Sequence, residues 1–105
     1  MPLLIFCTCP DADIAEQLAR ELVAAKLAAC VNILPGVRSV YAWQGAIESA
    51  GEHLLLIKSH RERYAELEAL LKQLHPYDVP EIIALPIERG SADYLNWMNS
   101  CLAIG

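Results

Sequence analysis

Three cysteines and one histidine are the side chains of this sequence best suited to bind a metal ion. Cys7 and Cys9 are two residues apart in an expected strand, so their sulfur atoms should point to the same face. Cys30 lies in a second apolar segment, and His75 ends an expected helix. Thiolates and imidazoles suit copper or zinc. The alternative is that the cysteines pack as small hydrophobic residues and that His75 binds the last carbonyl groups of its helix.

Catalysis is a second interpretation of the same side chains, and the sequence gives it little support. A Cys–His pair would need a third group to orient it and an activated thiolate, and neither is indicated. The carboxylates are dispersed, and we expect solvated positions for Glu48, Glu52, Glu81 and Asp93. The glycines are isolated, so no phosphate-binding loop is predicted. We therefore expect a binding protein and no enzyme.

Composition predicts one domain, residues 1–105, in the cytoplasm. No apolar run approaches the ~18 residues of a membrane span, and the N-terminus lacks the basic region of a signal peptide. The net charge of −5, without a basic stripe, argues against a general affinity for nucleic acid. In the cytoplasm the four cysteines are expected as free thiols. The hydrophobic content of 55% is high for so small a domain and indicates a buried interface.

The middle of the chain is expected to form three strands that fold back and forth. The apolar or aromatic runs are Leu27–Leu34, Val37–Ile47 and Leu54–Ile57. Pro35-Gly36 predicts a turn after the first run, and the small and polar residues Ser49–Glu52 predict the next reversal. Unbroken, the eleven-residue middle run would reach about 35 Å. Since a compact domain of this size has a radius of gyration of about 13 Å, such an arm bends or projects, and a projecting arm needs cover from a neighbouring subunit.

Helices and two further strands complete the expected architecture. Strands are predicted at Leu3–Cys9 and Glu81–Ile87. Helices are predicted from Asp11 or Asp13 to Lys26, from Ser59 to His75, and from Ser91 onwards. With the middle run treated as an extension of its neighbours, the order is βαββαβ followed by a helix. That order is typical of a ferredoxin-like α+β sandwich, in which two helices pack on one face of an antiparallel sheet.

Several segments together resemble one known family. They are CTCPD at residues 7–11, KLAACVNILPG at 26–36, SVYAWQG at 39–45 and HPYDVPEI at 75–82. In this order they resemble the CutA family, the divalent-cation tolerance proteins. The resemblance implies a ferredoxin-like protomer in a tight homotrimer, linked to tolerance of divalent metals and of copper in particular. It also implies Cys7, Cys30 and His75 as copper ligands, although Leu74 stands where some members have a second histidine.

A trimer of ferredoxin-like units is also similar to the PII signalling proteins, which bind small effectors between subunits. The corresponding clefts between subunits would be lined by the arm and by the segment His75–Glu81. Our candidate cleft residues are Tyr41, Trp43, Lys58, Tyr77, Glu81 and Trp97. Two hypotheses follow: a cytosolic homotrimer that binds copper or a related divalent ion without turnover, and a PII-like regulatory trimer that binds a small ligand or a partner protein.

Overall fold

The computed structural model describes all residues 1–105 and has the ferredoxin-like α+β architecture predicted from the sequence. Its strands are β1 (Pro2–Cys9), β2 (Cys30–Trp43), β3 (Ala46–His60) and β4 (Ile83–Pro86). Its helices are α1 (Ala12–Ala24), a short 3-10 turn η1 (Arg61–Arg63), α2 (Tyr64–Leu74) and α3 (Ala92–Cys101). The strands form one antiparallel sheet in the order β2-β3-β1-β4. No helix has the length and apolar character needed to cross a bilayer.

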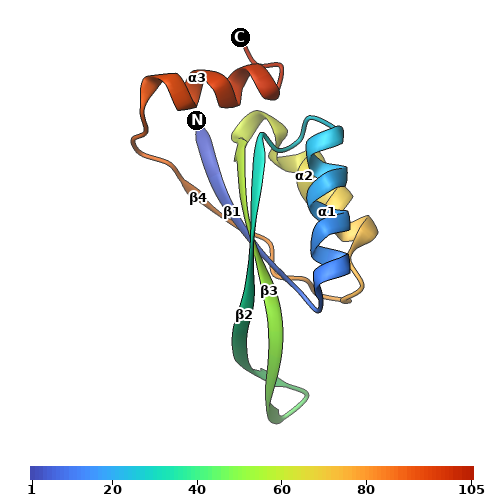
Figure 1. The fold of residues 1–105 in the computed structure, drawn as a ribbon. Coiled ribbons are helices and arrows are strands. Elements are labelled where there is room, and N and C mark those ends of the chain that lie inside the picture. The colour runs from blue at the N-terminus through green and yellow to red at the C-terminus, as the bar shows by residue number, and fades with distance from the viewer.

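The main core lies between one face of the sheet and the helices α1 and α2, which cover this inner face (Figure 1). Alternation along β1 and β3 directs Ile5, Cys7, Leu55 and Ile57 inward, and each is fully buried. The buried stripes of α1 and α2 complete the cluster. Asp11 caps α1 by accepting a hydrogen bond from the Ile14 amide at 2.9 Å, so the first of the two predicted caps is confirmed.

The long hairpin differs from the prediction, because two strands replace the three expected. β2 continues through Pro35-Gly36, where the pairing with β3 shifts between Leu34 and Val37. The predicted turn is therefore a β-bulge, and the segment Ser49–Glu52 lies inside β3. The chain reverses instead at Gln44-Gly45, whose φ angles of 48° and 81° are both positive, as a tight hairpin turn requires.

Two further boundaries also differ from the prediction. Ser59 does not open the second helix: it belongs to β3, is fully buried, and donates a hydrogen bond to the Leu27 carbonyl at 2.6 Å. The helix begins later, at Tyr64, after η1. β4 is shorter than the predicted strand, so Glu81 lies in the preceding loop. The cap at Ser91 is confirmed, since its hydroxyl accepts from the Tyr94 amide at 3.2 Å.

The hairpin projects from the body of the molecule, as expected for an arm of this length (Figure 1). The molecule measures 46 × 25 × 22 Å, and the outer parts of β2 and β3 form one end of its long axis. Most residues from Arg38 to Ser49 are exposed. The outer face of the sheet is also only partly covered. Its half-buried or exposed apolar side chains are Leu4, Phe6, Leu54, Leu56, Ile83 and Leu85.

Candidate functional site

Cys7 lies on the inner face of β1, within the main core. It is fully buried, as is Cys9 two residues later. Burial raises the pKa of the Cys7 thiol to about 12 and that of Cys9 to about 11, and nearby acidic groups add to both shifts. Since the thiolate is the form that binds metals, these two sulfur atoms are held in their non-ligating form.

His75 is also buried, and both of its ring nitrogens already have partners. Its Nε2 donates to the Thr8 carbonyl at 2.8 Å, and its Nδ1 accepts from the Tyr77 amide at 3.1 Å. A carbonyl only accepts and an amide only donates, so these two contacts define one neutral tautomer. Metal binding at either nitrogen would break one of these hydrogen bonds. His75 therefore ties the end of α2 to β1 and positions the loop that follows.

Cys30 lies on the opposite face of the sheet from Cys7. Cys30 pairs with Lys58, which pairs in turn with Leu4, whereas Cys7 pairs with Leu55. Directly paired residues share a face and successive residues alternate, so Cys30 points outward and Cys7 points inward. A single chain thus does not bring the three predicted ligands together. Nowhere in the chain do three histidine, cysteine, aspartate or glutamate side chains gather closely enough to hold an ion.

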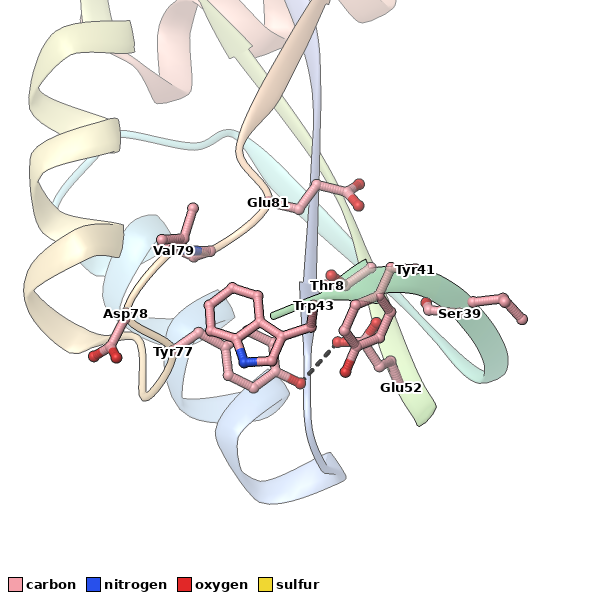
Figure 2. Close-up of a pocket in the computed structure, with 11 residues that line it drawn as sticks. Thr8, Ser39, Tyr41, Trp43, Glu52, Tyr77, Asp78, Val79 and Glu81 are labelled. Carbon is pink, nitrogen blue, oxygen red and sulfur yellow. Dashed lines mark hydrogen bonds between the residues drawn. The ribbon is translucent and has the colours of Figure 1, made fainter. Parts of the chain in front are cut away.

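The chain instead forms a pocket of about 650 Å³ between the hairpin and the loop after α2. Figure 2 shows its side chains, which come from β1, both hairpin strands and the loop. The lining residues are Thr8, Ser39, Val40, Tyr41, Trp43, Glu52, Tyr77, Asp78, Val79, Pro80 and Glu81. The wall combines three aromatic rings with three carboxylates and carries no lysine, arginine or histidine.

Glu52 and Tyr77 form the polar contact at the base of this wall. Glu52 is only 7% exposed, and its Oε2 accepts a hydrogen bond from the Tyr77 hydroxyl at 2.7 Å (Figure 2). Burial, followed by this hydrogen bond and the charge of Glu52, raises the pKa of Tyr77. The expectation that Glu52 is a solvated surface residue is therefore wrong. Its place in an alternating strand, two residues before Leu54 and four before Leu56, was the available signal.

The bulge in β2 determines which hairpin side chains reach the pocket. Before the bulge, Cys30 and Asn32 share the outer face with Lys58 and Leu56. After it, Val37 pairs with Glu52, so the odd-numbered residues Ser39, Tyr41 and Trp43 take the outer side. Without the extra residue, these aromatic side chains would turn away from Glu52. The Pro35-Gly36 segment thus shifts the register of β2 by one residue and does not reverse the chain.

The structure separates the six predicted cleft residues into two groups. Tyr41, Trp43, Tyr77 and Glu81 line the pocket. Lys58 and Trp97 do not: the Lys58 amine lies 5.9 Å from the centre of the Tyr94 ring, and Trp97 packs against the same ring. The six predicted residues do not include the polar lining residues Thr8, Ser39, Glu52 and Asp78, although Ser39 and Asp78 lie in the two segments predicted to line the cleft.

Comparison with known proteins agrees with the fold and with the sequence motifs. Residues 3–101 match the family model described as CutA1 divalent ion tolerance protein. The chain belongs to the CutA1 family. A divalent-cation tolerance protein CutA from Pectobacterium atrosepticum is 47% identical, over 95% of this chain and 91% of that protein.

Solved CutA structures superpose closely on this chain. CutA from Xylella fastidiosa is 46% identical with a TM-score of 0.94, over 96% of this chain and 97% of that one. CutA from Archaeoglobus fulgidus, described as a periplasmic divalent cation tolerance protein, is 40% identical with a TM-score of 0.95. The match covers 97% of this chain and 99% of that one. The family assignment from the sequence is therefore confirmed, and the chain is a member of a divalent-cation tolerance family.

Proposed function

We propose that this CutA1 chain forms a cytoplasmic homotrimer that contributes to tolerance of divalent metal ions, copper in particular, without catalytic turnover. The observation that carries the assembly is the open outer face of the sheet. Ile83 and Leu85 are 52% and 49% exposed there, beside Phe6 and Leu56. A contiguous apolar surface of this kind is typical of an interface, and covering it with further copies of the chain would remove it from water. The number of subunits, three, is what the resemblance to CutA proteins implies.

In a single chain, Cys30 is the predicted ligand that an arriving metal ion reaches most easily. It is partly exposed on the outer face, while Cys7 and His75 are buried in the core. We propose that Cys30 binds the ion first. Cys7 and His75 join the site only if the core opens, because each must give up its present environment. The free state of all four cysteines supports a reducing compartment.

A metal titration followed by mass spectrometry under native conditions tests both the proposed assembly and the proposed metal site. Cadmium is the first probe, because it binds thiolates without oxidising them, and copper follows. We expect a trimer that takes up metal, a large loss of uptake in Cys30→Ser, and a smaller loss in Cys7→Ala. His75→Gln, which keeps a hydrogen-bonding group, reports whether the imidazole takes part. Equal uptake by the native chain and Cys30→Ser would contradict the proposed site, and a single 11.6 kDa species would contradict the assembly.

The pocket supports a second function, that of a PII-like regulatory trimer with a small-ligand site. It lies within one chain, where the arm meets the loop after His75, and these are the two segments that we expect to line the cleft between subunits. Its volume is within the usual range of about 300–1,000 Å³ for small-molecule sites. A panel of metabolites screened by thermal melting tests this function, because a ligand at 100 times its Kd stabilises the folded state by about 2.7 kcal/mol. A panel without any shift would contradict it.

A further inference from the structure

We infer that the pocket between the hairpin and the loop after α2 binds a small organic cation, of the substituted or quaternary ammonium class. The inference deepens the second function proposed above and rests on it, since it names the ligand class of that pocket. Three features carry it: the charge of the wall, the spacing of the carboxylates, and the aromatic side chains beside them.

The charge of the wall selects a cation over an anion. Glu52, Asp78 and Glu81 all line the pocket, and no basic side chain balances them. The chain as a whole carries a net charge of −5, so the long-range field has the same sign. A phosphate or carboxylate ligand would enter against this field with no cation to receive it. Nucleotides and organic acids are therefore poor ligands for this pocket.

The spacing of the carboxylates disfavours a bare metal ion. A divalent ion such as magnesium or calcium needs several oxygen ligands at about 2.0–2.6 Å. The three pocket carboxylates do not gather into such a group. Spread around a cavity of about 650 Å³, they suit a cation whose charge is distributed over several carbon atoms. An organic ammonium ion has this distribution.

Aromatic rings in the pocket wall provide further contacts for a cation. Tyr41 and Trp43 are 45% and 46% exposed, and with Tyr77 they bring three rings to one pocket. The faces of aromatic rings attract cations, and groups of them recognise quaternary ammonium ligands in many proteins. Glu52 adds a fixed negative charge: only its Oε2 is bonded to Tyr77, which leaves Oε1 without a hydrogen bond from the chain.

The two tryptophans allow a direct test, because only Trp43 lines the pocket. Trp97→Phe leaves Trp43 as the single reporter, and Trp43→Phe leaves Trp97, which has almost the same exposure of 45%. Choline chloride is titrated into each protein in the presence of a chelator, with sodium chloride holding the ionic strength constant. We expect a saturable change in fluorescence in Trp97→Phe and none in Trp43→Phe. The neutral isostere 3,3-dimethylbutan-1-ol should bind at least about tenfold more weakly.

A charge variant and its matched control complete the experiment. Glu52→Gln keeps an acceptor for Tyr77 but removes the charge, and we expect it to weaken choline binding about tenfold. Glu21→Gln removes the same charge from an exposed position on α1, outside the pocket, and should leave binding unchanged. Equal binding of choline and its neutral isostere, equal losses in both glutamine variants, or no saturable signal would each overturn the inference. Because the titration excludes metal, a protein that fails it but still forms trimers and takes up cadmium leaves the metal-tolerance proposal standing.

Discussion

The two faces of the sheet carry similar apolar side chains but differ in what covers them. On the inner face, α1 and α2 of the same chain bury Ile5, Leu55 and Ile57 completely. On the outer face, Phe6, Leu56 and Ile83 remain partly or largely in contact with water. Neighbouring residues of one strand, such as Leu55 and Leu56, thus belong to different environments. The chain folds through its inner face, and its outer face is the surface through which we propose that copies assemble.

The same division separates the candidate ligands. Cys7 lies inside with a raised pKa, whereas Cys30 lies outside. The pocket belongs to the outer side, because the bulge in β2 places Tyr41 and Trp43 beside Glu52 there. Residues on the inner face should therefore affect folding, and residues on the outer face should affect assembly and binding.

The largest effect is expected from Leu55→Ala, compared with the same change at its neighbour Leu56. Leu55 is fully buried in the main core, so its truncation should lower the free energy of unfolding by about 2–5 kcal/mol. This loss should be similar at all protein concentrations. Leu56→Ala should cost less in dilute protein, and its cost should grow with concentration as assembly covers the outer face. Urea unfolding at two concentrations a hundredfold apart measures both. A concentration-independent loss in Leu56→Ala would contradict the division between the faces.

A smaller effect is expected from the thiols of the inner face as pH rises. In the unfolded chain a cysteine ionises at about pH 8.5, whereas folding raises the pKa of Cys7 to about 12 and that of Cys9 to about 11. Between pH 9 and 10 the folded state therefore holds more protons than the unfolded state, and stability must fall with rising pH. We expect a loss of about 1 kcal/mol per thiol over this interval. Cys7→Ala and Cys9→Ala should each remove about 1 kcal/mol of this loss in denaturant unfolding, and an unchanged slope in both variants would contradict the role of these thiols.

Features that depend on local patterns could be predicted from the sequence. The apolar run at Leu3–Cys9 nearly coincides with β1, and Asp11 and Ser91 cap their helices as expected. The prediction of a turn at Pro35-Gly36 was wrong because the position of β2 in the sheet overrides the local preference of this dipeptide. β2 is the edge strand of the sheet, where a proline without an amide hydrogen costs little and a bulge is tolerated. The actual turn begins at Gln44, a residue type that rarely takes a positive φ.

Only part of the pocket could be predicted from the sequence, because the rest depends on how the strands pair. Tyr41 and Trp43 share a face by simple alternation, and the loop residues Tyr77 and Glu81 follow a helix end that proline marks. Which carboxylate meets them depends on the register across the bulge, which single-strand patterns do not contain. Alternation places Glu52 on the face of Leu54 and Leu56, but only the structure shows that it meets Tyr77. The ligand set of Cys7 and Cys30 fails within one chain on the same ground, because the faces of two strands separated by a third follow from their register.

The smallest effect on the folded chain is expected from Ile83→Lys, compared with Val23→Lys. Ile83 is 52% exposed on the outer face of β4, and Val23 is 45% exposed on α1. Either lysine can reach water in a single chain, so we expect changes in unfolding free energy of about 0.5 kcal/mol or less in dilute protein.

Assembly should nevertheless distinguish the two variants completely. A second copy seated on the outer face would bury the charge at position 83 without a partner, which interfaces tolerate poorly. Ultracentrifugation should therefore find Ile83→Lys as folded 11.6 kDa chains and Val23→Lys as trimers. Trimers of Ile83→Lys would show that the outer face is not the surface through which copies meet. Dissociation of Val23→Lys would instead indicate that copies meet through the helices.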